Sequence, residues 1–177
     1  ETNQSVYVFT GFTAAQGTAD SVAVPAMEDG GIVFSNFTAN GVAEATSEND
    51  KFSFAGWDLG ANNGLTSYPN LTGVINTGKY YEFTVSDDIT QLMNMTALTF
   101  DVSRSVDGPR TFSVRSSVDN FTSNIAGSIN PANPGLSVQG SNIFFITGDN
   151  ATQQTGSRIT LGGNNFALND GSITFRI

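Results

Sequence analysis

Clusters of acidic and amide side chains are the segments of this sequence with the clearest potential for chemistry. They lie in stretches rich in Gly, Asn and Ser, which are typical of loops, and carboxylate oxygens are the ligands that Ca²⁺ prefers. Turns in which Asp and Asn bind their own backbone explain the same clusters without a metal, because the spacing matches neither an EF-hand nor a nonapeptide repeat. We therefore expect either no cofactor or one structural Ca²⁺, with ligands drawn from Asp50, Asp87, Asp88, Asp149 and Asp170.

Residues for the commonest catalytic sites are missing from the sequence. It contains no Cys and no His, which excludes thiolate nucleophiles, Ser-His-Asp triads and the usual zinc sites. The best candidates for a pair of catalytic carboxyl groups, as in glycoside hydrolases, are Glu82 and Asp101. Because the chain has 16 acidic residues, such pairs also arise by chance, and we expect a protein that is not an enzyme.

The charge of the chain bears on its partners. Its formal net charge is −9, and both nucleic acid and anionic lipid need a cationic surface, so we expect neither as a partner. No run of about 18 apolar residues occurs, so we expect no membrane span. We interpret Glu1 as a mature terminus left after removal of a signal peptide, although a trimmed chain fits equally well.

Period-two alternation of apolar and polar residues recurs along the chain, whereas helical periodicity does not. Each alternating segment is bounded by Gly, Asn, Asp or Pro, as is typical of short strands in a sandwich or a barrel. We expect one domain over residues 1–177, with strands at 5–12, 31–37, 51–57, 79–85, 97–104, 110–118, 141–147, 157–163 and 171–177. The predicted core is Phe34, Phe52, Phe54, Phe83, Val85, Phe100, Val102, Phe112, Val114, Phe145 and Phe175.

Three of the seven cationic residues lie close together, at Arg104, Arg110 and Arg115. A hairpin that turns at residues 107–109 would place Val102 opposite Val114 and Asp101 opposite Arg115, which would explain the arginines as local charge balance. The forked guanidinium groups would alternatively bind a sugar or a carboxylate.

The segment from Tyr80 to Phe121 resembles a jelly-roll-like domain of secreted bacterial surface proteins, many of which carry exosortase-type (PEP-CTERM) sorting tails. The matching patterns are "YxEFTV", "LTFDxxRS", a Gly-Pro turn and "FSVRSSxDxF", with "KFSFAGW" and "GSITFRI" on either side. The resemblance implies a jelly-roll-like sandwich of two antiparallel sheets, with about nine strands and minimal helix, and an extracellular or cell-surface location. Family members continue past "FRI" with a further strand, so we expect an open sheet edge there.

Two functions follow as expectations. The first is a structural or adhesive subunit of a surface fibre or layer that polymerises by strand complementation. Its donor residues would be Val6, Val8 and Phe9, and the acceptor edge would carry Ile173, Phe175 and Ile177. The alternative is a carbohydrate-binding module of a polysaccharide-associated secreted protein. Its candidate residues are Trp57, Tyr68, Arg104 and Arg110, with Tyr7 and Tyr80 as further rings for stacking on sugars.

Overall fold

The computed structural model describes residues 7, 9, 32–44, 50–57, 75–87, 92–105, 108–148, 151–169 and 171–177. Within these ranges the chain forms fifteen short strands and three 3-10 helices, and no α-helix. All strand pairs there are antiparallel. The predicted all-β, sandwich-like fold is therefore confirmed, although the strands are shorter and more numerous than the expected count of about nine. No helix in the described ranges is long and apolar enough to cross a membrane.

Among the described residues, the largest sheet, called the main sheet below, is built around the longest strand, β5. Its order is β1–β5–β15–β9, and β2 pairs with the other half of the same edge of β5. The strands are β1 (Ile32–Phe34), β2 (Thr38–Asn40), β5 (Tyr80–Asp87), β9 (Arg115–Ser116) and β15 (Ser172–Arg176).

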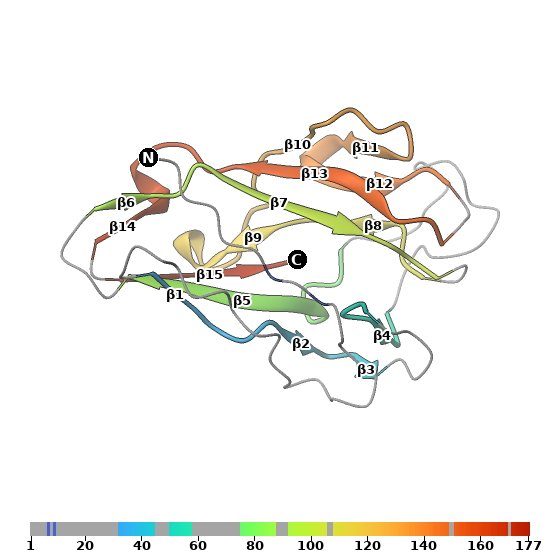
Figure 1. Cartoon of the computed structure of the whole chain (residues 1–177), viewed down its shortest axis with the longest axis horizontal. Coiled ribbons are helices and arrows are strands. Elements are labelled where there is room, and N and C mark those ends of the chain that lie inside the picture. The colour runs from blue at the N-terminus through green and yellow to red at the C-terminus, as the bar shows by residue number, and fades with distance from the viewer. Residues whose placement is uncertain are drawn as a thin grey trace.

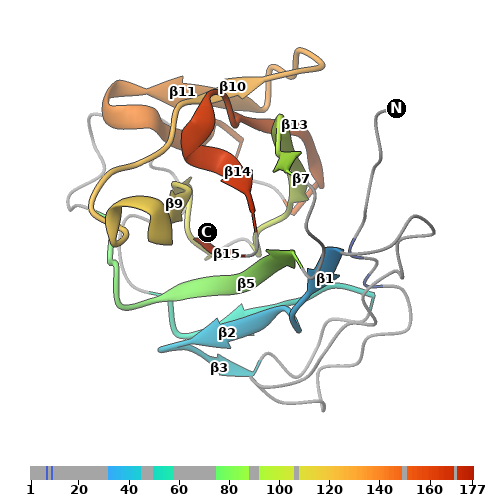
Figure 2. The same cartoon turned by 90° about the vertical axis from the view of Figure 1, so that its left-hand side faces the viewer.

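The remaining strands form smaller sheets, and most of them lie across the core from the main sheet. Figures 1 and 2 both place β5 in one layer and β7, β10, β11 and β13 in the other. Two three-stranded sheets have the orders β10–β13–β7 and β11–β12–β8, and two ribbons pair β14 with β6 and β3 with β4. The bounds are β3 Ala43–Glu44, β4 Phe54–Ala55, β6 Met93–Asn94, β7 Ala97–Val102, β8 Thr111–Phe112, β10 Gly127–Ile129, β11 Leu136–Gln139, β12 Ile143–Ile146, β13 Gln154–Thr160 and β14 Ala167–Leu168. The 3-10 helices are η3 Ser117–Asp119, η4 Gly140–Asn142 and η5 Asn164–Phe166.

Alternation along β5 and β15 decides which side chains face the core and which face outward. Phe83 lies opposite Phe175, and both are buried with their rings stacked at 5.4 Å. The even-numbered neighbours, Glu82 and Arg176, lie opposite each other and therefore share the other face. The main sheet thus has an aromatic inner face and a polar outer face.

The predicted core is largely confirmed. Phe54, Phe83, Val85, Val114, Phe145 and Phe175 are buried. Four further predicted residues, Phe34, Phe52, Phe100 and Phe112, are partly buried and pack against the central cluster. Val102 is half-buried at the end of β7.

The predicted hairpin around residues 107–109 is wrong. Strand β7 pairs with β13, so Val102 lies opposite Gln154 rather than Val114. Strand β9 pairs with β15, so Arg115 lies opposite Arg176 rather than a carboxylate. The chain between β7 and β8 crosses from one sheet to another, and the segment predicted as one strand over 110–118 is divided between two sheets.

Candidate functional site

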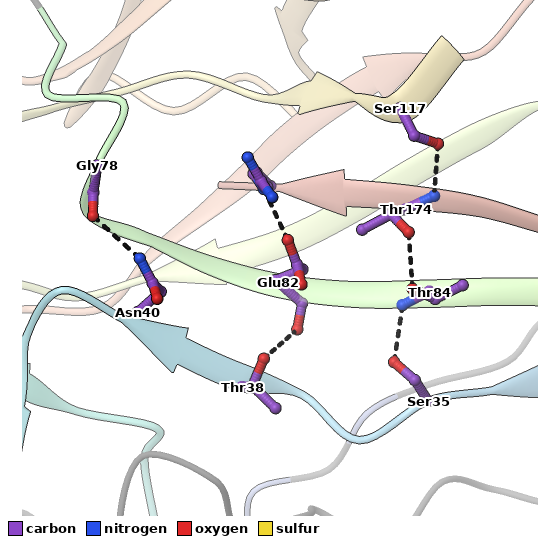
Figure 3. Close-up of polar contacts among 9 residues, drawn as sticks. Ser35, Thr38, Asn40, Gly78, Glu82, Thr84, Ser117 and Thr174 are labelled. Atoms are coloured by element: carbon purple, nitrogen blue, oxygen red, sulfur yellow. Dashed lines mark hydrogen bonds and ion pairs between the residues drawn. The ribbon is translucent and has the colours of Figure 1, made fainter. Parts of the chain in front are cut away.

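The outer face of the main sheet carries a row of hydroxyl groups that crosses its strands. The Thr84 amide donates to Ser35 Oγ at 2.8 Å, the Thr84 and Thr174 hydroxyls lie 2.8 Å apart, and the Thr174 amide donates to Ser117 Oγ at 3.0 Å (Figure 3). Side chains therefore reinforce the ladder between β5 and its neighbours, which makes this face a polar platform with fixed positions.

The centre of this face is the side chain of Arg176. Its Nε donates to Glu82 Oε2 at 2.6 Å, and each of these two side chains keeps 31% of its surface exposed. The guanidinium carbon lies 4.2 Å from the ring centroid of Tyr80 and 3.8 Å from that of Phe121. Both contacts are within the range of cation–π attraction. In the part of the chain that the structure describes, no protein atom accepts a hydrogen bond from Nη1 or Nη2 of Arg176.

Phe121 reaches Arg176 from a strained stretch of backbone. Asn120 and Phe121 both occupy the left-handed region, with φ of 57° and 58°. Asn tolerates this conformation, but a bulky residue such as Phe adopts it rarely and at a cost of roughly 1–3 kcal/mol. The amide of Phe121 donates to Ser116 O at 2.8 Å, which ties the strained residue to the end of β9. Strain of this kind persists only where the surroundings enforce it, and it gathers at functional sites.

Asp119 fixes the other side of the same turn. Its carboxylate accepts hydrogen bonds from the amides of Thr122 and Ser123 at 3.2 and 2.9 Å and from the Thr122 hydroxyl at 3.0 Å. Slight desolvation raises the pKa of Asp119, but these hydrogen bonds outweigh it and leave the pKa below the usual 3.8. The ionised carboxylate therefore stabilises the loop that carries Phe121.

Arg115 connects the strand to this loop and to a second one. Its Nη1 donates to Phe121 O at 2.9 Å, and its Nε donates to Asn124 Oδ1 at 2.8 Å. The amide group of Asn124 in turn donates to Ser141 O at 2.8 Å. Residues of β9 thus bind both the amide and the carbonyl of Phe121, which fixes the Phe121 ring over Arg176.

The predicted sugar-binding arginines are buried instead, so the prediction that they offer their forks to a ligand is wrong. Arg110 is fully buried, and its Nη1 lies within 3.0–3.2 Å of the carbonyl oxygens of Ile146, Thr147 and Gly148. Arg104 is 5% exposed, and its Nε donates to Gly108 O at 3.0 Å. Both arginines therefore hold the crossover between the sheets together from inside.

The predicted aromatic site is only partly described. Trp57 is half-buried beside β4, where its Nε1 donates to Phe54 O at 2.7 Å and its ring meets Tyr81 edge to face. This arrangement explains Trp57 as part of the aromatic cluster of the core. Tyr68 lies outside the described residues. Tyr80 is the ring of the predicted set that reaches the outer face of the main sheet.

The calcium prediction stays untested. Asp50 is exposed, with a φ of 57°, whereas Asp87 is buried at the end of β5, opposite Ile32. Asp88, Asp149 and Asp170 lie outside the described residues. Among the side chains that are described, no three of Asp, Glu, His or Cys come together as a metal site would require.

The two carboxyl groups considered for catalysis lie in different sheets. Glu82 belongs to β5 and is paired with Arg176, whereas Asp101 belongs to β7 and accepts a hydrogen bond from Gln153 Nε2 at 2.8 Å. The fold places a cation or an amide, rather than the second carboxyl group, beside each of them.

The expectation of an open edge beside residues 171–177 is wrong for Phe175 and Arg176, which pair with β9. Strand β15 is flanked by β5 on one side and by β9 on the other. Ile173 and Phe175 are buried in the core, Ile177 is partly buried, and the Ile177 amide and carbonyl both bond with Tyr81. Residues 115–117 therefore occupy the place where an incoming strand was expected.

The N-terminal segment contributes two rings to the core of its own chain. Tyr7 packs against Phe34, Phe37 and Phe83, with ring centroids 5.4–5.8 Å apart, and its hydroxyl donates to Ser35 O at 2.7 Å. Phe9 packs against Phe37 at 5.4 Å. The predicted donor Phe9 is thus a core residue, while the donors Val6 and Val8 lie outside the described residues.

Sequence reasoning missed Arg176 and Phe121. Alternation of apolar and polar residues in "YYEFTV" and "SITFRI" indicates that Glu82 and Arg176 face outward. It does not indicate that their two strands are adjacent. No signal in the sequence marks Phe121, because its position depends on a left-handed backbone that its residue type disfavours.

Comparisons with known protein families, curated proteins and solved structures find no match to this chain. The resemblance to jelly-roll-like domains of exosortase-sorted surface proteins stays a prediction.

Proposed function

We propose that this protein is a non-enzymatic, extracellular carbohydrate-binding module, and that the outer face of its main sheet is the binding surface. The observation that carries this proposal is the contact of the Arg176 guanidinium with the rings of both Tyr80 and Phe121, with Glu82 fixing its direction. A partly exposed arginine that is held by two aromatic rings and by one carboxylate is preorganised to bind a ligand through its terminal nitrogens.

The chemistry of this face suits a sugar better than an apolar ligand. A sugar ring presents pairs of hydroxyl groups and apolar C–H faces. The free edge of the Arg176 guanidinium offers parallel N–H donors for two neighbouring oxygens, and the second oxygen of Glu82 offers an acceptor. Tyr80 and Phe121 supply aromatic surface beside them.

The strain at Phe121 supports a binding role over a purely structural one. Packing alone needs no strained backbone, because an outward-facing ring on a sheet contributes little to the core. The structure instead uses Ser116, Asp119 and Arg115 to hold Phe121 in an unfavourable conformation. Preorganising an aromatic ring before a ligand arrives lowers the entropy lost on binding.

A glycan array followed by calorimetry tests the proposal. The native protein is expected to bind at least one polysaccharide class, and Arg176→Gln is expected to weaken that binding about tenfold or more. Arg158→Gln is the matched control, because Arg158 is a partly exposed cation on β13 in the opposite layer. Absence of any bound glycan, or equal binding by both variants, would overturn the proposal.

The N-terminal rings favour a second candidate, which is a self-assembling surface subunit. Tyr7 and Phe9 fill the aromatic cluster around Phe37, and a segment that contributes side chains in this way can be exchanged between identical copies. In this form of strand complementation the acceptor is the cluster of Phe34, Phe37 and Phe52, rather than the covered edge of β15.

Deletion of residues 1–12 tests this second candidate. If the segment is exchanged, the full-length protein forms multimers in light scattering, and the truncated protein is a folded monomer that binds the free 1–12 peptide. If the full-length protein stays monomeric at high concentration and the truncated protein unfolds, the segment completes its own domain and the candidate is wrong.

A further inference from the structure

Two arginines lie directly opposite each other on the outer face of the main sheet. Arg115 of β9 is the cross-strand partner of Arg176 of β15. Like charges placed opposite each other in a sheet are destabilising, and the chain has only seven cationic residues to set against 16 acidic ones. Because Arg115 and Arg176 repel each other, an anion bound between them would stabilise this part of the sheet.

Among the described residues, no carboxylate forms an ion pair with Arg115. Glu82 neutralises Arg176, with a distance of 2.6 Å between Nε and Oε2. The carboxylate of Asp119 is engaged by the amides and the hydroxyl of its own loop. In the part of the chain that the structure describes, the hydrogen-bond acceptors of Arg115 are uncharged, namely Asn124 Oδ1 and Phe121 O. The face formed by Arg115, Arg176 and Glu82 therefore carries one excess positive charge.

The two guanidinium groups also keep donors for a ligand. Among the described residues, nothing accepts a hydrogen bond from Arg115 Nη2 or from the terminal nitrogens of Arg176. Their remaining nitrogens are engaged, so the direction of each fork is fixed. Guanidinium forks of this kind match the two oxygens of a carboxylate or of a sulfate ester, and hydrogen bonds to such anions are stronger than those to hydroxyl groups.

We infer that this face selects an acidic sugar residue, whose anionic group binds between Arg115 and Arg176. The inference rests on the proposed carbohydrate-binding function and specifies its ligand class. The Phe121 carbonyl accepts a hydrogen bond from Arg115, and the Phe121 ring packs on Arg176. Phe121 therefore helps to position both guanidinium groups. The negative charge of the whole chain opposes the approach of a polyanion, but at physiological salt that repulsion is screened beyond about 8 Å. The contact between fork and anion is screened much less.

Binding to pairs of polymers that share a sugar backbone but differ in charge tests whether the protein recognises the anionic group or the sugar itself. The probes are polygalacturonate and its methyl ester, which share a backbone, and dextran sulfate and dextran. Binding is measured by calorimetry in 0.15 M NaCl with EDTA present, so that a calcium bridge between protein and polymer cannot form. The variants are Arg115→Gln and Arg176→Gln, with Arg158→Gln as the control, and thermal melting confirms that each variant is folded.

The inference predicts that at least one acidic polymer binds about tenfold or more tightly than its neutral counterpart. Arg115→Gln and Arg176→Gln each reduce that preference about tenfold, whereas Arg158→Gln does not change it. Tighter binding of polygalacturonate identifies a carboxylate ligand, and tighter binding of dextran sulfate identifies a sulfate ester.

Three results would overturn the inference, and they separate it from the proposed function. Equal binding of the acidic and neutral members of a pair would leave carbohydrate binding in place but remove its charge preference. Preference for an acidic polymer that survives both arginine substitutions would locate the anion elsewhere. Failure of all four polymers, together with an array on which no glycan binds, would contradict the proposed function itself.

Discussion

Phe121 joins Arg115 to the outer face through its backbone: the Phe121 carbonyl accepts a hydrogen bond from Arg115 Nη1 at 2.9 Å, while its ring covers Arg176. The strained turn at 120–121 is therefore the point at which β9, β15 and the following loop meet. A change of backbone conformation there moves a ring and a guanidinium group together. This coupling makes the turn the most informative place to separate stability from binding.

Phe121→Gly should reduce carbohydrate binding while it preserves or increases stability. Glycine adopts the left-handed conformation without penalty, so the substitution relieves strain as it removes the ring over Arg176. We expect about tenfold weaker binding in calorimetry, since cation–π support of about 1 kcal/mol and the fixed direction of the fork are lost. Asn120→Gly is the matched control, because it relieves the neighbouring φ of 57° but keeps the ring. Equal binding losses in both variants would mean that the ring is not part of the site.

Gly127→Ala should destabilise the protein, because the position is filled by an aromatic ring. A Cβ at Gly127 would lie 2.5 Å from Cε2 of Phe144, which is fully buried and stacked on Phe112 at 4.9 Å. The ring has no room to withdraw, so we expect a loss of roughly 1–3 kcal/mol in urea unfolding.

Gly140→Ala provides the comparison for this position. No heavy atom lies within 4 Å of a Cβ at Gly140, so the expected change is small or slightly stabilising. Combining Gly127→Ala with Phe144→Leu should cost less than the sum of the single substitutions. Strict additivity would show that the two residues do not compete for the same space.

The inner and outer faces of the main sheet were predictable because they depend on local alternation. "YYEFTV" and "SITFRI" alone place Phe83 and Phe175 inward and Glu82 outward, and a one-residue slip would reverse every side chain. Strand partners were not predictable in the same way. The partner of β7 is β13, more than fifty residues away, whereas sequence reasoning chose the nearest segment with complementary charges.

The arginines show why local charge patterns misled the prediction of the site. The predicted hairpin that turns at residues 107–109 would place Arg104 and Arg110 on either side of that turn. In the fold they are buried, and carbonyl oxygens from the end of β12 and the residues after it accept their hydrogen bonds. Such carbonyls carry no sequence signature. Arg176, close to the C-terminal end, looked unremarkable until its strand was placed between β5 and β9.

Arg110→Leu should be strongly destabilising even though no ligand is involved. The substitution leaves the carbonyl oxygens of Ile146, Thr147 and Gly148 without the donor that Nη1 supplies in the buried crossover. Losing a buried charged donor of this kind typically costs about 3 kcal/mol or more. Arg158→Leu, at a partly exposed position on β13, should stay within about 0.5 kcal/mol of the native protein. Comparable melting temperatures for both variants would contradict a structural role for Arg110.

The pH dependence of stability should reveal the hydroxyls of two partly buried tyrosines, Tyr7 and Tyr81. Burial raises the pKa of Tyr7 and of Tyr81 above the ordinary value of 10.0, and interactions of Tyr7 with the Ser35 side chain and of Tyr81 with the Phe54 backbone oppose this only in part. The unfolded chain therefore releases these protons at a lower pH than the folded chain does. The stabilisation is complete below about pH 10 and is lost as the pH rises further, by at most about 1.4 kcal/mol per pH unit for Tyr81 and by less for the more exposed Tyr7.

Urea unfolding between pH 8 and pH 12 measures this slope in the native protein and in its phenylalanine variants. Tyr7→Phe and Tyr81→Phe each remove one titrating group, so Tyr81→Phe should flatten the alkaline decline by up to about 1.4 kcal/mol per pH unit, and Tyr7→Phe should flatten it by less because Tyr7 is more exposed. Each should also cost about 1 kcal/mol at neutral pH, because the hydrogen bond to Ser35 O or to the Phe54 backbone is lost. The double variant should lose both contributions to the decline. An unchanged slope in the double variant would show that these hydroxyls already ionise freely in the folded protein, and that the aromatic cluster holding Tyr7 is open to solvent.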